Sequence, residues 1–372
     1  MRARPNVLQL EPYQPGKSLE ELKRELGLDE IVRLSANENP LGPSPRALQA
    51  IQQFLPSIHL YPDGYCQHLR HALAAFYQLP PDHFAFGNGS DELIHFLGLA
   101  YLEPGDEVIV AHPSFVRYDA AALLNNATLH RVPLTPDYRH DLPAMQAHVN
   151  ERTKLLFIAN PNNPTGTLVY RDEVERLLKA LPPHVLVVLD EAYFEYVDHP
   201  DYPDGLTYVR AGYNVIVLRT FSKAYGLAGL RIGYAVARAE ILEPLERVRE
   251  PFNVNAVAQV AAAAALTDQE HVQRTRELNR QGLNYLYQLC EQLGLRYIPS
   301  WANFVMIDTG RDSRAVFQAL LHRGVLVRTG DIFGMPTFIR VNTGTPEGNM
   351  RFAEALQAAL CEGKNLVGEA RQ

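Results

Sequence analysis

Between residues 84 and 218, short apolar runs alternate with segments of helical pattern. Apolar runs of this length, rich in β-branched side chains, are typical of buried strands. Strands that alternate with helices form a mostly parallel sheet that helices cover on both faces. We therefore expect an α/β fold whose larger part contains these strands: Phe84–Phe86, Glu107–Ala111, Thr128–Val132, Lys154–Ala159, Val185–Leu189 and Asn214–Leu218.

The pattern changes after Glu250. An alanine-rich helix and a long polar helix lead into shorter strands and helices, which indicates a smaller α+β domain. At 372 residues the chain is long enough for two domains. We expect an N-terminal arm at 1–30, a large domain at 31–250 and a small domain at 251–372. The first strand and the loop after it are open to assignment to either domain.

Composition excludes several classes of protein. A net charge of -7 without any cluster of Lys and Arg argues against a nucleic-acid surface. No apolar run is long enough to span a bilayer, and no apolar segment follows the basic N-terminus. The scattered Cys66, Cys290 and Cys361 are expected of a reducing cytosol, so we expect a cytoplasmic protein. His68 and His71 would share a helix face, but nothing completes a metal site, and we expect no metal.

One lysine stands directly after a predicted strand. Lys223 follows the run Asn214–Leu218 and lies between Ser222 and small residues, with a second cation at Arg231. In apolar surroundings a lysine loses pKa because desolvation disfavours its charged form. Its neutral amine can then form a Schiff base with a carbonyl. The alternative is a lysine that extends from a loop into solvent.

Two further predicted strands are followed by unusual loops. Open parallel sheets bind ligands at the carboxyl ends of their strands, where these loops begin. The segment Gly87–Glu92 opens a helix, where glycines and free N–H groups suit a phosphate. The alternative there is a plain turn capped by Ser90. The segment Asn160–Gly166 contains two prolines, which should fix a rigid loop that orients Asn163 as a donor.

Asp190 ends the apolar run Val185–Leu189, and a carboxylate there is costly unless a cation pairs with it. The cation is either a structural arginine or a cationic ring nitrogen, which would lower the carboxyl pKa by about 1–3 units. Tyr193 can bond a ring hydroxyl. Together these residues fit pyridoxal 5'-phosphate. They offer an amine that can form a Schiff base with its aldehyde, an aspartate for its pyridinium nitrogen, ligands for its phosphate and donors to its phenolic oxygen.

The same residues carry a family resemblance that extends in order from Tyr13 to Arg340. The chain resembles the fold-type-I pyridoxal-phosphate aminotransferases, most closely the histidinol-phosphate aminotransferase family. The matching blocks are Asn-Pro-x-Asn-Pro-Thr-Gly at 160–166, Asp-Glu-Ala-Tyr at 190–193 and Ser-Lys-x-x-Gly-Leu-Ala-Gly-Leu-Arg-x-Gly-Tyr at 222–234. This resemblance implies an aspartate-aminotransferase-like fold with residues 31–250 as the cofactor-binding domain.

The resemblance also implies the catalytic roles. Lys223 would hold the cofactor as an internal aldimine and shuttle the proton. Asp190 would pair with the pyridine nitrogen, while Asn163 and Tyr193 would bond the ring oxygen. Phe115 would stack on the pyridine, at a position where many relatives have tyrosine. The implied ligands of the cofactor phosphate are Ser90, Asp91, Ser222 and Arg231.

Two tyrosines match positions that act between subunits in this family. Tyr61 would reach the cofactor phosphate of the partner subunit, and Tyr13 would lie near the substrate. Both imply a homodimer with an inter-subunit active site. Taken as single residues, Tyr61 before Pro62 is equally typical of a turn, and Tyr13 indicates nothing specific.

Arg328 and Arg340 end two apolar runs of the small domain. Arginine suits a bidentate grip on an oxyanion. In aminotransferases generally the later arginine holds a substrate carboxylate, whereas in the histidinol-phosphate family the pair resembles a phosphate clamp. Two arginines on the surface are the alternative.

The predicted activity is amino transfer between L-histidinol phosphate and 2-oxoglutarate, in histidine biosynthesis. Its small-molecule substrates are thus an amine and a 2-oxo acid. The resemblance leaves two rivals: an aromatic amino-acid aminotransferase, which would use Arg340 for the carboxylate, and a threonine-phosphate decarboxylase, which breaks a different bond. Pyridoxal-phosphate-binding transcription factors carry a similar domain, but they need a DNA-binding module for which the arm is too short.

Overall fold

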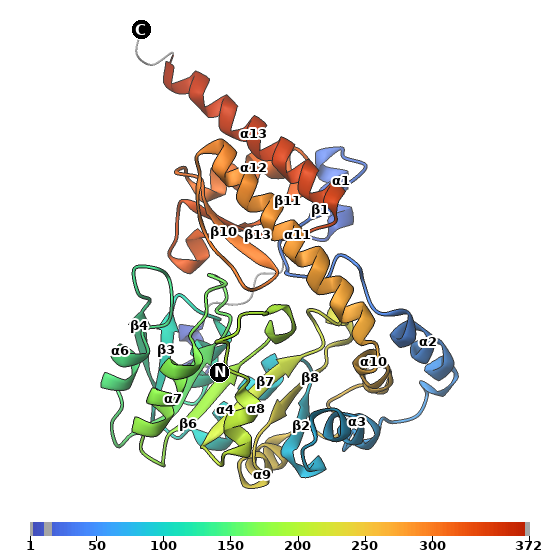
Figure 1. Cartoon of the computed structure of the whole chain (residues 1–372), viewed down its shortest axis with the longest axis vertical. Coiled ribbons are helices and arrows are strands. Elements are labelled where there is room, and N and C mark those ends of the chain that lie inside the picture. The colour runs from blue at the N-terminus through green and yellow to red at the C-terminus, as the bar shows by residue number, and fades with distance from the viewer. Residues whose placement is uncertain (1–2, 11–16, 369–372) are drawn as a thin grey trace.

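The structure is a computed structural model that describes residues 3–10 and 17–368. Figure 1 shows two lobes, a larger one built around a seven-stranded sheet and a smaller one above it. The α/β class predicted from the sequence is confirmed, as is the smaller domain with a sheet of its own. None of the described helices is long and apolar enough to cross a membrane.

The large sheet is mostly parallel. Parallel pairing joins β4 to β3, β3 to β5, β5 to β6 and β6 to β7, whereas β8 runs antiparallel to both β7 and β2. Each apolar run predicted as a strand forms one. In spatial order the strands are β2 (Phe84–Gly87), β8 (Gly233–Val236), β7 (Val215–Thr220), β6 (Leu186–Asp190), β5 (Thr153–Ala159), β3 (Glu107–His112) and β4 (Thr128–Pro133).

Helices cover both faces of this sheet, because successive residues of a strand point to opposite sides. Leu156 and Val187 belong to the core on one face, and Phe157 and Val188 to the core on the other. The first face is covered by α3 (Gln67–Tyr77), α6 (Leu142–Ala147), α7 (Arg171–Ala180), α8 (Gly205–Arg210) and α10 (Ala256–Leu266), against which α2 (Pro45–Phe54) packs. The second is covered by α4 (Ser90–Tyr101), α5 (Arg117–Leu124) and α9 (Ala239–Val248).

The small lobe has an antiparallel sheet in the order β12-β13-β10-β9. Its strands are β12 (Arg328–Thr329), β13 (Phe338–Asn342), β10 (Phe304–Asp308) and β9 (Arg296–Ile298). It packs against α11 (Gln269–Leu293) and α12 (Ser313–Leu321), and α13 (Pro346–Gly368) packs on these two helices. In Figure 1, α11 runs from the larger lobe into the smaller one.

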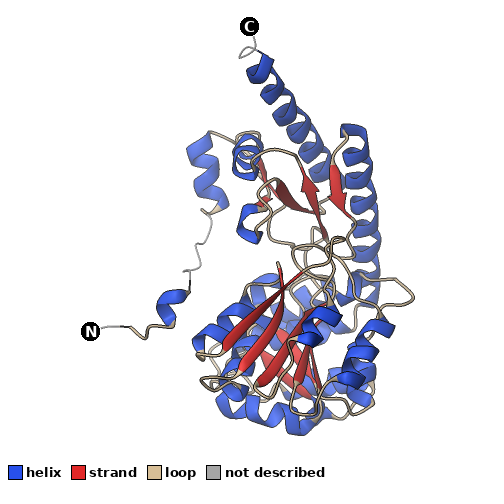
Figure 2. Cartoon of the chain, turned by 90° about the vertical axis from the view of Figure 1, so that its left-hand side faces the viewer, coloured by secondary structure: helices blue, strands red, loops and turns tan. Residues whose placement is uncertain are grey.

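The first strand lies against the small lobe, because β1 (Val32–Arg33) pairs in parallel with β11 (Val325–Leu326). Of the N-terminal arm, α1 (Leu19–Leu26) lies beside the small lobe (Figure 2). Short 3-10 helices complete the described elements: η1 (Val7–Gln9), η2 (Leu55–Ser57), η3 (Pro81–His83), η4 (Phe194–Tyr196), η5 (Ala228–Leu230) and η6 (Asp331–Phe333).

Candidate active site

A cavity of about 1040 Å³ lies where the carboxyl ends of the parallel strands face the small lobe. It collects side chains from five strand ends of the large lobe and from both small sheets of the other lobe. The structure brings these sequence-predicted residues together in its wall: Ser90, Asp91, Phe115, Asn163, Asp190, Tyr193, Ser222, Lys223, Arg231, Arg328 and Arg340.

Lys223 follows β7 and points toward the loop between β1 and α2. Its Nζ lies 3.4 Å from the carbonyl oxygen of Ala36 and 5.7 Å from the centre of the Tyr193 ring. Burial, and after it the positive charge of Arg340, lowers the pKa of Lys223 to about 8. About a tenth of this amine is therefore neutral at pH 7, and the neutral form is the nucleophile.

Asp190 ends β6 and is only 5% exposed. Tyr118 donates a hydrogen bond of 2.6 Å to its Oδ2, and the backbone N–H of Ala192 donates to its Oδ1 at 3.2 Å. Burial raises the pKa of Asp190 to about 6, although both hydrogen bonds oppose the shift. None of the described arginines pairs with Asp190, and Arg219 on the neighbouring strand bonds Glu191 instead. Within the described residues the carboxylate therefore has no ion-pair partner, and a protonated ring nitrogen would supply one.

Sequence reasoning missed Tyr118. It lies on α5, is 1% exposed and stacks on Phe157 at 4.6 Å between ring centres. Its position three residues after Phe115 gave no sign that the hydroxyl would reach a strand end 72 residues away.

Tyr193 is held by a second residue that sequence reasoning missed. Asn37, in the loop between β1 and α2, donates a hydrogen bond of 2.9 Å from Nδ2 to Tyr193 Oη. The ring of Tyr193 also packs edge-on against Phe304, 5.3 Å away. Burial raises the pKa of Tyr193 to about 12, so the phenol stays protonated at neutral pH. In the sequence the segment around Asn37 predicted only an irregular loop.

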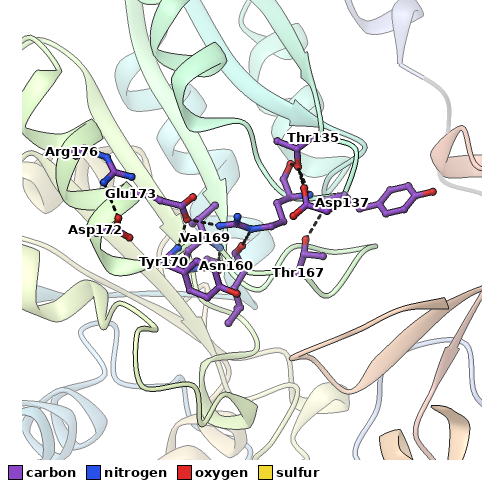
Figure 3. A network of polar contacts seen from close by, with 12 residues as sticks. Thr135, Asp137, Asn160, Thr167, Val169, Tyr170, Asp172, Glu173 and Arg176 are labelled. Atoms are coloured by element: carbon purple, nitrogen blue, oxygen red, sulfur yellow. Dashed lines mark hydrogen bonds and ion pairs between the residues drawn. The ribbon is translucent and has the colours of Figure 1, made fainter. Parts of the chain in front are cut away.

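The asparagine loop after β5 is fixed by its own side chains. The amide of Asn160 exchanges hydrogen bonds with the backbone of Val169, at 3.0 and 3.1 Å, and further bonds hold the following segment (Figure 3). Ser114 donates to Asn162 Oδ1 at 2.8 Å, and Asn162 Nδ2 donates to Thr165 at 2.9 Å. This frame explains how Asn163 can keep one orientation toward the cavity.

Arg340 reaches from β13 to this loop. Its Nη1 donates to Asn163 Oδ1 at 2.6 Å and its Nη2 to the carbonyl oxygen of Ser35 at 3.1 Å. Arg328 stands directly opposite Arg340 in the pairing of β12 with β13. Burial, opposed by Tyr193 and reinforced by Arg328, lowers the pKa of Arg340 to about 10. Two facing cations repel each other, so a bound anion would stabilise the pair.

A cradle for a phosphate lies at the start of α4. Arg231 adopts φ 57° and donates from Nη1 toward Ser222 Oγ at 3.4 Å, and its guanidinium lies 3.6 Å from Asp91. A Cβ on Gly89 would overlap the Arg231 guanidinium, so the close approach requires glycine there. Free helix N–H groups, a hydroxyl and an arginine are a typical phosphate site.

The three remaining predicted residues differ in placement. Phe115 is partly buried and stands edge-on to Tyr118, with ring centres 5.7 Å apart. Tyr61 is 85% exposed, stacks on Phe252 at 4.9 Å and does not line the cavity of its own chain. Tyr13 lies outside the described residues.

The donor set fits pyridoxal 5'-phosphate on two features of this structure. Asp190 is a buried carboxylate without a cationic partner among the described residues, and Lys223 is a cation with a lowered pKa in the same cavity. One group that brings a ring cation to Asp190 and a carbonyl to Lys223 would satisfy both. The cradle at α4 would then hold its phosphate.

Comparisons with known proteins agree with this chemistry. Residues 29–356 match the model of the family "Aminotransferase class I and II". Histidinol-phosphate aminotransferase of Moorella thermoacetica is 53% identical over 360 residues, covering 96% of this chain and 93% of that protein.

Solved structures give the same picture. Histidinol-phosphate aminotransferase of Sinorhizobium meliloti, in complex with pyridoxal-5'-phosphate, superposes with a TM-score of 0.89 at 30% identity, covering 97% of this chain and 98% of that one. Aspartate aminotransferase of Thermus thermophilus with maleate, at 24% identity and a TM-score of 0.83, covers 96% and 100% and shares the fold. The chain therefore belongs to the class I and II aminotransferase family, in which it groups with the histidinol-phosphate aminotransferases.

Proposed function

We propose that this chain transfers the amino group between L-histidinol phosphate and 2-oxoglutarate in histidine biosynthesis, with pyridoxal 5'-phosphate as cofactor. The observation that carries the substrate is the facing pair Arg328 and Arg340, which gives the cavity a positively charged wall in the small lobe. A substrate phosphate is the anion that best matches two guanidinium groups. The relatives at about half identity support the same substrate.

Each side chain of the cavity has a role in this reaction. When bound, pyridoxal 5'-phosphate supplies a carbonyl that takes up amines and a ring that withdraws electrons from the substrate carbon. Asp190 would accept a hydrogen bond from the ring nitrogen and keep it protonated, while Asn163 and Tyr193 would donate to the ring oxygen. Phe115 would cover one face of the ring. Ser90, Asp91, Ser222 and Arg231, with the N–H groups of α4, would surround the phosphate.

Lys223 would move the proton. With a substrate amine bound, the neutral Nζ of Lys223 would accept the proton from the substrate carbon and pass it to the carbonyl carbon of the cofactor. A pKa of about 8 suits this exchange, because both protonation states are accessible near neutral pH. Arg340 would hold the carboxylate of glutamate or 2-oxoglutarate in the second half of the cycle.

The substrate assignment can be tested by comparing amino donors. We expect amino transfer from histidinol phosphate to exceed transfer from phenylalanine, and Arg328→Ala to raise KM for histidinol phosphate by about 10–100-fold. Arg328→Ala should raise KM for glutamate by a smaller factor. Arg296→Ala, which removes an exposed arginine from β9 of the same sheet, serves as control. Equal rates with both donors, or an unchanged KM in Arg328→Ala, would favour the aromatic aminotransferase.

The product distinguishes threonine-phosphate decarboxylation from the proposed amino transfer. A decarboxylase would release carbon dioxide from a phosphorylated amino acid and would need no 2-oxo acid. We expect turnover to stop when 2-oxoglutarate is withheld.

We also propose a homodimer with an inter-subunit site, located in the cytoplasm, without nucleic-acid or membrane partners. Large apolar side chains that the single chain leaves exposed support the dimer, since such patches mark interaction sites. Around Tyr61 they are Leu55, Ile58, Leu60, Tyr65 and Phe252. The proposed domain division stays at 1–30, 31–250 and 251–372, and the pairing of β1 with β11 favours counting the first strand with the small domain.

A further inference from the structure

We propose that Asn37 is a positioning residue: it aims the Tyr193 hydroxyl at the ring oxygen of the cofactor, and it links that aim to the small lobe. The inference rests on the proposed function, since it concerns how the same cavity acts on pyridoxal 5'-phosphate. Asn37 is 2% exposed and lines the cavity together with Tyr193 and Lys223.

The direction of one hydrogen bond determines where the Tyr193 hydroxyl proton points. Asn37 Nδ2 donates to Tyr193 Oη at 2.9 Å, and an amide nitrogen has no lone pair with which to accept. The hydroxyl oxygen is therefore the acceptor in this bond, and the Tyr193 proton must point elsewhere. Since Tyr193 lines the cavity, that proton is available to a ring oxygen bound there. The phenol can donate because it stays protonated at neutral pH.

The position of Asn37 is fixed by the other lobe. Its backbone N–H donates to Asn342 Oδ1 at 3.1 Å, and Asn303 Nδ2 donates to its carbonyl oxygen at 3.0 Å. Asn342 ends β13 and Asn303 directly precedes β10, so both belong to the small lobe. They are 3% and 1% exposed, which makes these bonds stronger than bonds in water. The small lobe thus holds the backbone whose side chain directs Tyr193 in the large lobe.

This link also connects Tyr193 to the substrate arginine. Asn342 lies two residues after Arg340 on β13, so the strand that carries Arg340 also holds Asn37. A movement of β13 upon substrate binding would reach the Tyr193 hydroxyl through Asn37.

One feature argues against a purely structural asparagine. Its Oδ1 is buried without a hydrogen-bond partner in the described part of the chain, which is unfavourable. Its backbone adopts φ 55°, a left-handed conformation in which asparagine and glycine are both common. Glycine would fit this backbone equally well and would avoid the unmet acceptor. Asparagine at this position is best explained by the hydrogen bond that its Nδ2 donates to Tyr193 Oη.

The test is the pH midpoint of the visible absorption change of the cofactor-loaded enzyme. A donor to the ring oxygen stabilises its negative charge and keeps this midpoint low. Asn37→Gly keeps the left-handed backbone and removes the amide. We expect it to raise the midpoint by about one pH unit, because the Tyr193 hydroxyl is then free to turn away. Asn37→Asp, whose side chain accepts but cannot donate, should raise it further, because Tyr193 would donate to the new carboxylate.

A double-mutant cycle shows whether Asn37 acts through Tyr193. In the Tyr193→Phe background, Asn37→Gly should cause no further shift. Asn279→Ala is the matched control: its buried amide in α11 bonds Ala302 and Thr343, not Tyr193, so the midpoint should stay at the wild-type value. Thermal unfolding of each cofactor-free variant establishes that it is folded.

An unchanged midpoint in Asn37→Gly, or an equal shift in the wild-type and Tyr193→Phe backgrounds, would overturn the inference about Asn37 and leave the proposed function standing. A wild-type protein that shows no visible band with added cofactor would contradict the proposed function as well, so the two failures are distinguishable.

Discussion

At the scale of single residues, the cavity drives the pKa values of two opposite groups toward each other. Burial raises the pKa of Asp190 to about 6 and lowers that of Lys223 to about 8. Each shift means that the folded protein disfavours the charged form, although both groups carry most of their charge at pH 7. The cofactor-free fold is therefore less stable than its packing allows, and ligand binding removes this cost. Such clusters are typical of active sites.

Replacing Lys223 should stabilise the cofactor-free protein. The folded pKa of about 8 lies below the ordinary 10.5, so the unfolded chain binds the proton more tightly between these values. The destabilisation is complete below pH 8 and disappears as the pH rises toward 10.5. We expect Lys223→Met to raise the free energy of unfolding by about 1–3 kcal/mol at pH 7 and by much less at pH 10.

Denaturant titration of the cofactor-free proteins at both pH values measures this difference. An equal gain at pH 7 and pH 10 would contradict the electrostatic cause. The same variant should lack the visible band of the loaded enzyme and all transfer activity, because the other lysine in the wall of the described cavity, Lys17, pairs with Glu25 of the N-terminal arm.

Tyr118 should tune Asp190. Its hydrogen bond favours the ionised carboxylate, so Tyr118→Phe should raise the Asp190 pKa and move the acid limb of the pH–rate profile upward by about one unit. The stacking of the ring on Phe157 is retained in this variant, so packing serves as its own control. Rate profiles of wild type and variant that superimpose would exclude this role.

These residues also show what the sequence could predict. Lys223, Asp190 and Asn163 each stand next to an apolar strand, and position relative to the strand end is a local property. Tyr118 and Asn37 act on partners 72 and 156 residues away, and only the folded topology brings these pairs together. Their side chains carry no local signal of such contacts.

At the scale of elements, buried ions tie the ends of β6 and β7 together. Arg219 is fully buried on β7 and donates to Glu191 Oε2 from Nε and Nη2, at 2.9 and 2.7 Å. Nη2 also donates to Asp204, and the guanidinium stacks on the Phe194 ring at 3.5 Å. Glu191 directly follows Asp190, and Arg219 precedes Lys223 by four residues. The two strand ends that present the catalytic pair are thus held in a fixed register.

The start of α4 depends on a glycine. Gly89 has φ 77°, and a Cβ there would overlap the Arg231 guanidinium of the phosphate cradle. We expect Gly89→Ala to displace Arg231 and weaken cofactor binding by about 10–100-fold, as measured by absorbance titration of the cofactor-free protein.

Gly105→Ala is the matched control for this prediction. Gly105 also has a positive φ, 97°, but a Cβ would meet nothing within 4 Å. The control variant carries similar backbone strain without the overlap. Equal losses of cofactor affinity in both variants would assign the effect to strain instead of the cradle.

At the scale of the whole molecule, the cavity exists because two lobes meet. Arg340 of the small lobe bonds Asn163 of the large one, and the loop that follows β1 contributes Asn37 and the carbonyl oxygens of Ser35 and Ala36. The α/β alternation predicted the large sheet because each apolar run forms one buried strand. It could not place β1, which pairs with a strand almost 300 residues later in the chain.

Among the predicted site residues that the structure describes, Tyr61 is the one that lies away from the cavity of its own chain. It is 85% exposed, and its neighbours Ile58 and Leu60 are 61% and 60% exposed. A phenol stacked on Phe252 and surrounded by exposed apolar side chains is well placed for a partner subunit. If Tyr61 completes the site of the second chain, each dimer contains two sites built from both subunits.

Mixing an inactive variant with an impaired one tests this arrangement. Lys223→Ala destroys the site in its own chain, and Tyr61→Ala should impair the site of the partner. In a mixed dimer one site then carries both changes and the other carries neither. Random exchange of subunits should therefore restore about a quarter of wild-type activity.

The control is a mixture of Lys223→Ala with Asp190→Asn. Both of these residues line the cavity of their own chain, so every site of a mixed dimer keeps one lesion and no activity should return. If Tyr61 acts within its own chain, its mixture with Lys223→Ala behaves like this control. Recovery in the first mixture alone requires a dimer in which Tyr61 reaches the site of the partner subunit. A site built from one chain would keep the substitution of that chain in every mixture.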